Sequence, residues 1–400
     1  MQIAAECCIA GGGPAGMMLG LLLARAGRRV VVLEKHGDFL RDFRGDTIHP
    51  STLELLHELG LLDAFLKLPQ QRVSELQAQF GGMSFPVADF SRLPVRCPFI
   101  ALIPQWDFLA FLAENAKRYP GFKLLMQAEA TGLLFDGDKV SGVKGTSPQG
   151  AFEVRAGLVV GADGRHSTVR EQAQLEVLDL GAPIDVLWFR LSRRPRDPQA
   201  TMARFGGGQL MVMLNRGDYW QCAFVIAKGS LEVLRSRGLD AFRARLTRSV
   251  PFAADRMDEI DSWDKLKLLT VQVNRLRQWH RAGLLCIGDA AHAMSPVGGV
   301  GINLAIQDAV AAANVLWKGD FSAASLRAVQ RRREFPTRIT QAFQVVVQNN
   351  VLMRVLADEA PLKAPLAVRL LARWPALRRM AARMVGLGAR PEHIGSPIAA

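Results

Sequence analysis

The feature that most constrains this chain is a GxGxxG pattern at residues 11–16, set between two segments of regular structure. The apolar run 4–10 before it predicts a buried strand, and the run 17–26 after it predicts a helix. A further run, 28–33, ends in three valines and a leucine, as in a strand buried on both faces of a parallel sheet. Residues 1–34 therefore predict a strand–helix–strand unit, the building block of an α/β fold.

The pattern has the context of a dinucleotide-binding turn. Gly11 permits the tight turn, Gly13 lets the backbone approach a pyrophosphate, and Gly16 allows the helix to pack closely on the sheet. The pyrophosphate of a bound dinucleotide faces the positive N-terminal end of the helix. Glu34, at the end of the second strand and 18 positions beyond Gly16, is placed to accept hydrogen bonds from an adenosine ribose.

Two aspartates, Asp163 and Asp289, each follow a short apolar run that predicts a strand. In open α/β sheets, ligands bind at the edge where the strands end. After Asp289, the Gly-rich loop 296–303 opens a predicted helix over 304–317, so its backbone N–H groups and helix dipole can face a developing anion. Three such segments at one edge predict a single elongated cofactor.

The pattern changes between residues 182 and 227 to strand-like runs without helices between them, which predicts an inserted, mostly antiparallel sheet. Beyond residue 302 the chain reads as predominantly helical. We therefore expect a discontinuous first domain (1–75, 101–181 and 268–345), an inserted substrate-binding domain (76–100 and 182–267), and a C-terminal helical region (346–400).

Three motifs in this order resemble the class A flavin-dependent monooxygenases, the p-hydroxybenzoate hydroxylase-like family. They are GxGxxG with Glu34, GADGxxSxVR from Gly161, and GDAAHxxxPxxGxGxN from Gly288. The resemblance implies a Rossmann-like FAD-binding domain with an inserted substrate sheet, non-covalent FAD, and NADH or NADPH as a transient reductant. It also implies that O2 is activated as a flavin C4a-hydroperoxide that hydroxylates an aromatic or polyketide-like small molecule.

The same resemblance assigns site residues. Asp163 matches a residue tied to the pyrophosphate and to NAD(P)H use, and Asp289 matches the ribityl-binding aspartate. The cofactor-binding set is Gly11, Gly13, Pro14, Ala15, Gly16, Glu34, Lys35, Arg44, Gln105, Asp163, Asp289, Pro296, Gly298, Gly299, Gly301, Ile302 and Asn303. The flavin-ring environment, where catalysis takes place, is assigned to Arg44, Pro296 and Gly298. The sequence identifies no side-chain base and no metal site, and His292 reads as structural.

Substrate contacts are expected from aromatic and basic residues on the inserted sheet, namely Trp188, Arg190, Tyr219 and Trp220. Alternation along a strand says only that neighbours take opposite faces. Two other functions remain open: a halogenase or prenyl-chain reductase of the same superfamily, and a flavin-binding protein without turnover. The paired-tryptophan WxWxIP segment typical of tryptophan halogenases is absent from the sequence.

The chain is basic, with 50 Lys and Arg against 37 Asp and Glu and a pI near 10.1. Residues 360–391 hold seven basic residues and no acidic one. Because no basic stretch is interleaved with aromatics and no zinc-ligand spacing occurs, we do not expect nucleic acid as a partner. In the C-terminal helix, one face gathers Leu366, Leu370, Leu377, Met380 and Met384. We expect that face to pack on the core, and contact with anionic lipid is the other interpretation.

Localisation follows from what the sequence lacks. The five cysteines form no CxxC motif, and Glu6 lies where a signal peptide needs basic residues. The longest clean apolar stretch, 15–24, has about half the roughly 20 residues of a membrane span. We expect a reduced cytoplasmic protein without a transmembrane segment, as a monomer or homodimer.

Overall fold

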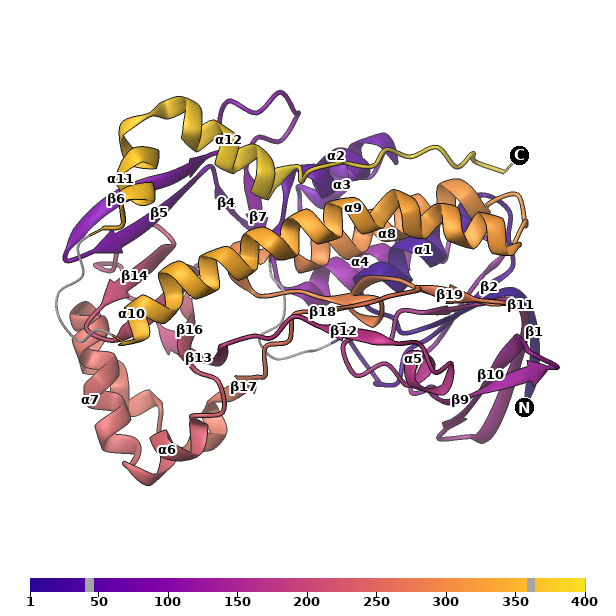
Figure 1. The fold of residues 1–400 in the computed structure, drawn as a ribbon, viewed down its shortest axis with the longest axis horizontal. Coiled ribbons are helices and arrows are strands. Elements are labelled where there is room, and N and C mark those ends of the chain that lie inside the picture. The colour runs from indigo at the N-terminus through magenta and orange to yellow at the C-terminus, as the bar shows by residue number, and fades with distance from the viewer. Residues whose placement is uncertain (40–46, 358–363, 400) are drawn as a thin grey trace.

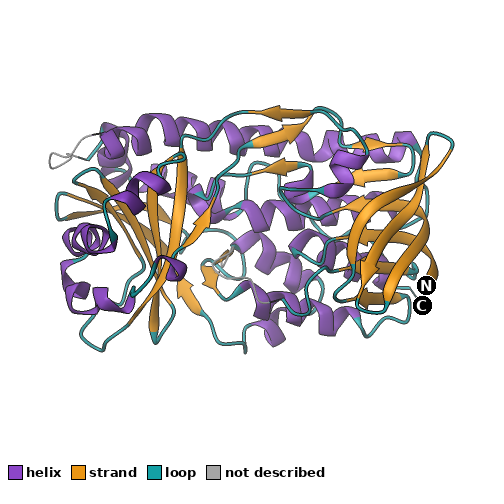
Figure 2. Ribbon diagram, turned by 90° about the horizontal axis from the view of Figure 1, so that it is seen from below, coloured by secondary structure: helices purple, strands orange, loops and turns teal. Residues whose placement is uncertain are grey.

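The structure is a computed structural model that describes residues 1–39, 47–357 and 364–399. Two large sheets lie at opposite ends of the molecule, and helices fill the space between them (Figures 1 and 2). The predicted α/β class with an inserted sheet is therefore confirmed.

The first sheet has the strand order β19-β20-β11-β1-β2-β8, and all neighbours from β20 to β8 are parallel. Its centre is the predicted unit of strand, helix and strand. A two-stranded antiparallel extension, β10 and β9, continues from the N-terminal half of β11. The elements are β1 (Gln2–Ala10), α1 (Pro14–Arg25), β2 (Val30–Leu33), β8 (Phe122–Leu125), β9 (Glu129–Asp136), β10 (Lys139–Ser147), β11 (Gly150–Gly161), β19 (His280–Arg281) and β20 (Leu284–Cys286).

The second sheet has the order β17-β13-β16-β15-β14-β5-β6 and is antiparallel except where β14 meets β5. Its strands come from two distant parts of the chain. The strands are β5 (Glu75–Phe80), β6 (Met83–Asp89), β13 (Ile184–Ser192), β14 (Met202–Gly206), β15 (Gln209–Asn215), β16 (Tyr219–Ala227) and β17 (Lys267–Leu269). Its outer face is covered by α6 (Leu231–Ser236), α7 (Leu239–Ser249) and the 3-10 helix η1 (Pro251–Glu259).

Long helices join the two ends. α8 packs against α1, and α9 runs on from the first sheet to the second (Figure 1). α8 (Gly301–Leu316), α9 (Ala323–Val347), a π-helical turn η5 (Gln348–Leu352) and α10 (Met353–Ala357) follow one another. The remaining elements are β3 (Thr47–Ile48), α2 (Pro50–Glu58), α3 (Leu62–Phe65), β4 (Gln71–Val73), β7 (Ile100–Leu102), α4 (Gln105–Ala116), α5 (Thr168–Gln172), β12 (Val177–Asp179), η2 (Trp263–Lys265), β18 (Asn274–Leu276), η3 (Gly288–Ala290), β21 (His292–Ala293) and η4 (Val297–Gly299).

One stretch of the described chain, Val297–Leu316, is long and apolar enough to cross a membrane by composition. However, 67% of its most apolar window is buried inside the protein, as in a core helix. All five cysteines are buried and free, including the adjacent pair Cys7 and Cys8, because β1 is covered on both faces.

The C-terminal region forms two helices, α11 (Leu366–Arg373) and α12 (Pro375–Gly386), which pack on β6. The expectation that their apolar face packs on the core is wrong for three of its five residues. Leu366, Leu370 and Met380 are 68%, 38% and 65% exposed. The reason is that other side chains make the inward contact, namely Val368 of α11 and Ala381, Ala382 and Val385 of α12.

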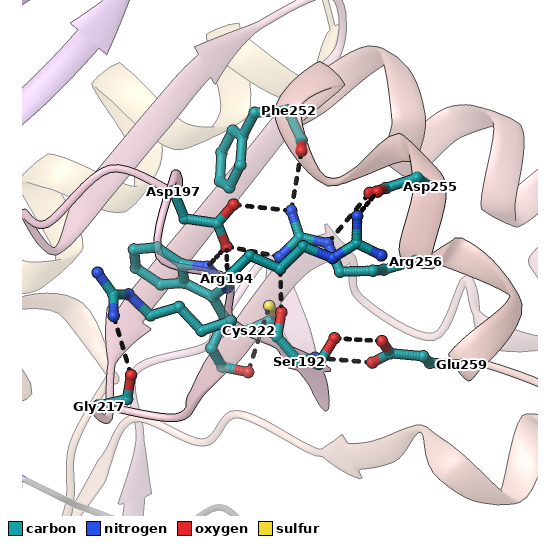
Figure 3. Close-up of polar contacts among 11 residues, drawn as sticks. Ser192, Arg194, Asp197, Gly217, Cys222, Phe252, Asp255, Arg256 and Glu259 are labelled. Atoms are coloured by element: carbon teal, nitrogen blue, oxygen red, sulfur yellow. Dashed lines mark hydrogen bonds and ion pairs between the residues drawn. The ribbon is translucent and has the colours of Figure 1, made fainter.

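A buried ion pair joins the inserted sheet to its covering helix (Figure 3). Asp197 accepts hydrogen bonds from both terminal nitrogens of Arg256, at 2.5 and 2.9 Å, and from the indole Nε1 of Trp220 at 2.9 Å. The side chains of Asp197 and Arg256 are 5% and 2% exposed. Burial alone would raise the pKa of Asp197, but the hydrogen bonds from Arg256, the Arg194 backbone and Trp220 outweigh it and lower that pKa to about 2.

We predict that Asp197→Asn lowers the free energy of unfolding at pH 7 by about 3–5 kcal/mol, because Arg256 stays buried without its counter-ion. The depressed pKa means that the carboxylate stabilises the fold above pH ~4 and that this contribution is lost as the pH falls from about 4 to 2. Urea unfolding across that range should show the two proteins converge at low pH. Asp261→Asn is the control, since Asp261 and its ion-pair partner Lys265 are both exposed and the change should cost under about 1 kcal/mol.

Candidate functional site

A cavity of about 990 Å³ extends from the glycine turn of the first sheet to the inner face of the second sheet. At one end its lining is mostly backbone and polar, from residues of the three predicted motifs. At the other end its lining is apolar, and includes Trp188, Val225 and Leu352. The rings of Phe80 and Phe205, which also line this end, are stacked with centroids 4.6 Å apart.

The glycine turn joins one tightly packed glycine to another that borders open space. Gly11 has a φ of +109°, and a Cβ there would lie 2.3 Å from the carbonyl oxygen of Ala162. A Cβ at Gly13 would meet nothing within 4 Å, so this residue borders open space in the cavity. Gly13 is also the N-cap residue of α1, and no side chain caps that helix. The free N–H groups of its first turn are therefore available to an anionic group.

Glu34 lines the same end of the cavity and is 6% exposed. Its carboxylate accepts hydrogen bonds from the backbone N–H of Gly12 at 3.2 Å and of His36 at 2.9 Å. These contacts hold the carboxylate at the end of β2, beside the glycine turn, where the sequence places a ribose-binding group.

Asp163 and Asp289 reach the cavity from the ends of β11 and β20. Asp163 also caps α5, since it accepts hydrogen bonds from Ser167 Oγ at 2.5 Å and Val169 N at 3.1 Å. Burial raises the pKa of Asp163 despite these bonds. Asp289 is less buried, and its carboxylate lies 3.6 Å from a guanidinium nitrogen of Arg165.

The loop before α8 forms a second glycine-rich wall. Gly298 and Gly299 have φ values of +81° and +64°, which favour glycine, and a Cβ at Gly299 would lie 2.7 Å from Thr47 Oγ1. Gly301 has no positive φ, and a Cβ there would find only Met294 Cβ at 3.9 Å. α8 begins without a side-chain cap. Two uncapped helix ends and a glycine-lined cleft therefore fit an elongated, anionic dinucleotide such as FAD.

Buried amides on α9 and on the first residue of η5 hold this loop from behind, and no sequence pattern had indicated them. Gln344 Nε2 donates to the carbonyls of Ser295 and Val297 at 2.9 and 3.0 Å, and its Oε1 accepts from Ser295 N at 3.1 Å. Gln348 Nε2 donates to Ser295 Oγ at 2.6 Å. Gln341, Gln344 and Gln348 are all fully buried. Their spacing in an otherwise amphipathic helix was the available signal, because buried amides need partners.

A buried charge network supports the Asp289 turn. Asp308 on α8 accepts from Gly288 N at 3.1 Å, from Arg333 Nε at 3.0 Å, and pairs with His292 Nε2 at 2.5 Å. Burial alone would raise the pKa of Asp308, but the neighbouring His292 and Arg333 hold it below the usual range. Arg333 also donates a hydrogen bond from Nη1 to Oε1 of Glu392 in the C-terminal tail, at 3.0 Å. His292 thus has a structural environment and does not line the cavity.

The structure brings most predicted cofactor residues to one wall. Those that line the cavity are Gly11, Gly13, Pro14, Ala15, Glu34, Lys35, Gln105, Asp163, Asp289, Pro296, Gly298, Gly299, Gly301 and Ile302. Two do not. A Cβ at Gly16 would lie 1.9 Å from Gly11 O, so Gly16 is a packing residue. Asn303 is turned away from the cavity, and its Oδ1 accepts hydrogen bonds from His49 N and Thr52 Oγ1. Arg44 lies outside the described residues. No group of His, Cys, Asp or Glu suited to a metal occurs within 1–39, 47–357 and 364–399.

Only one of the four substrate residues lines the cavity, namely Trp188. The other three assignments need correction. Trp220 lies on the opposite face of the sheet, because it is paired with Leu191 and both belong to the core beneath η1. Arg190 and Tyr219 stack on each other, 4.8 Å from guanidinium carbon to ring centroid, beyond the cavity lining.

Comparison with known proteins gives a consistent result. A family model described as an FAD binding domain matches residues 4–341. The chain is 34% identical over 389 residues to a 6-methylpretetramide 4-monooxygenase of Streptomyces rimosus, covering 95% of this chain and 91% of the relative. It is 30% identical over 323 residues to a rifampicin monooxygenase of Streptomyces venezuelae, covering 78% of this chain and 63% of that longer protein.

Solved structures share the fold. PqsL of Pseudomonas aeruginosa, described as a probable FAD-dependent monooxygenase, matches with a TM-score of 0.74 at 22% identity, over 88% of this chain and 98% of that one. The anhydrotetracycline hydroxylase OxyS of Streptomyces rimosus matches with a TM-score of 0.74 at 24% identity, over 96% and 76%.

We predict that Gly301→Val raises the FAD dissociation constant at least about tenfold, or ~1.4 kcal/mol. The new side chain has room within the protein and no backbone strain, yet it enters the cavity at the α8 end. Fluorescence titration of the apoprotein measures the constant, and melting of the apoprotein should be nearly unchanged. Gly299→Ala is the contrast: its Cβ strains the loop and should destabilise even the apoprotein. Normal FAD affinity in a folded Gly301→Val protein would contradict the assignment of this wall.

We predict that Gln344→Leu lowers the free energy of unfolding by about 2–3 kcal/mol, because buried groups of Ser295 and Val297 lose their partners. The freed loop should also bind FAD more weakly. Urea unfolding and FAD titration measure the two effects. Asn349→Leu is the control on the same helical run, since Asn349 is exposed and its replacement should stay within about 0.5 kcal/mol.

Proposed function

We propose, because this chain belongs to the FAD binding domain family and FAD is its cofactor, that it hydroxylates an aromatic or polyketide-like molecule with O2 and NADH or NADPH. Monooxygenases are among its relatives over most of the chain, and the protein is an oxidoreductase of that reaction class. The use of NADH or NADPH as the reductant, and of an aromatic or polyketide-like molecule as the substrate, are the specific parts of this proposal.

The observation that carries the proposal is the continuity of the cavity. One cavity connects the dinucleotide wall with a compartment under the inserted sheet. Its volume, about 990 Å³, lies at the upper end of the range for small-molecule sites. The apolar compartment suits a fused-ring aromatic molecule better than a small polar one, and a relative acts on 6-methylpretetramide according to its name.

Each part of the site has a defined task. Gly13 and the α1 N-terminus would hold the pyrophosphate, Glu34 the ribose, and Asp289 the ribityl chain. The loop from Pro296 to Gly301 would hold the flavin ring, with the N-terminal end of α8 directed at its electron-rich edge. When bound, FAD supplies the redox chemistry between the nicotinamide and O2. The apolar lining of the second compartment excludes water from that chemistry.

The experiment is anaerobic and aerobic turnover with a panel of tricyclic and tetracyclic phenols. We expect at least one compound to speed NADH or NADPH oxidation about tenfold or more, since closure around substrate gates many such steps. The product should carry one atom from ¹⁸O2. Oxidation that is equally fast with every compound, with all oxygen recovered as hydrogen peroxide, would contradict the proposal.

We predict that Trp188→Ala weakens binding of the stimulating compound about 10- to 100-fold, from the loss of ~1.5–3 kcal/mol of apolar contact. FAD affinity should not change, because Trp188 lies at the substrate end of the cavity. Leu268→Ala is the matched control on the neighbouring strand, since Leu268 pairs with Leu187 on the opposite face of the sheet. Equal effects of the two substitutions would place the substrate elsewhere.

A further inference from the structure

The outer surface of α11 and α12 carries large apolar side chains that nothing in the described chain covers. Leu366, Leu370, Trp374 and Met380 are 68%, 38%, 56% and 65% exposed. None of the four lines the cavity, so their exposed area faces outward. We call these four residues, with the arginines named below, the C-terminal patch. Contiguous exposed apolar side chains usually mark an interaction site.

The patch is strongly basic. Arg369, Arg373, Arg379 and Arg383 are exposed, and among the described residues none of them forms an ion pair. Arg378 differs, because it donates to the Ala372 carbonyl and lies near Asp89 of β6. There is no acidic residue between 360 and 391 in the sequence. The four arginines are therefore free to interact with an external anion.

The spacing places both kinds of side chain on one surface. Leu366 and Leu370 lie four residues apart on α11, and Arg369 and Arg373 each lie three residues after one of them, so these four side chains share one face of the helix. Trp374 follows directly after the last helical residue. An apolar stripe bordered by arginines is typical of a helix that lies in a membrane interface. Tryptophan is also the side chain that prefers the level of the lipid headgroups.

A second copy of this chain is a poorer occupant. A symmetric contact would bring the same arginines of two subunits together, and no acidic residue of 360–391 would offset them. The protein core cannot cover this outer face either, because α11 already packs on β6 with its inward side. From the apolar stripe and its unpaired arginines, we propose that the C-terminal patch binds the surface of an anionic lipid bilayer.

This contact would bring lipid close to the substrate compartment. Ala367, Val368 and Leu371 of α11 line the cavity, while Leu366 and Leu370 of the same helix face outward. α11 therefore separates the cavity from the proposed lipid surface by the thickness of one helix. The inference goes beyond the proposed reaction and does not depend on it.

The test is sedimentation of the FAD-loaded protein with vesicles of phosphatidylcholine alone and of equal parts phosphatidylcholine and phosphatidylglycerol. We expect binding to the anionic vesicles only, weakened by added salt. Arg369→Gln with Arg373→Gln should lower the partition coefficient about 25-fold, about fivefold for each arginine near the surface. Leu366→Ser with Met380→Ser should lower it about tenfold or more through lost apolar burial.

The control is Val233→Ser with Arg237→Gln, which removes one exposed apolar and one exposed basic side chain at α6 and should leave the partition coefficient unchanged. Bound FAD and the melting temperature confirm that each variant is folded. Three results would overturn the proposal: no vesicle binding, equal binding to both kinds of vesicle, or equal loss in the control. A concentration-dependent dimer that Leu366→Ser dissociates would assign the patch to a second copy instead.

Discussion

The site depends on backbone N–H groups that begin two helices at one edge of a parallel sheet. The turn after β1 starts α1, and the loop after β20 leads to α8, and neither helix has a side-chain cap. Such ends attract negative charge, and they cost free energy if they are buried without a partner. A long anionic cofactor satisfies both ends at once. This explains why glycine rather than polar side chains lines that end of the cavity.

Rigid contacts behind the loops make this arrangement specific. The carboxylate of Asp308 holds the turn at Gly288, and Gln344 holds the carbonyls of Ser295 and Val297. Buried charges and amides are unfavourable unless they are fully paired, so these groups restrict the backbone to one position. Asp308 of α8 and Gln344 of α9 therefore fix the position of the cavity wall, although neither residue lines the cavity.

The sequence predicted the parts that depend on local rules and missed those that depend on distant contacts. The strand–helix–strand unit and the glycine loops follow from short patterns of fixed spacing, and the structure has these elements there. The face of Trp220 could not be inferred, because alternation separates neighbours without saying which face is inward. Gln344 was missed because its partners lie about 50 positions earlier, and β5 joined β14 in a parallel pair that no local pattern indicates.

The inserted sheet and the C-terminal helices share one constraint. The sheet has apolar side chains on both faces, and each face is covered: one by α7 and η1, the other by the cavity and α10. α11 is also apolar on both sides, but among the residues that the structure describes only its inner side is covered. A helix that is apolar on two sides is stable when both are buried. The proposed lipid contact would bury that outer side, and the exposed arginines around it favour an anionic surface.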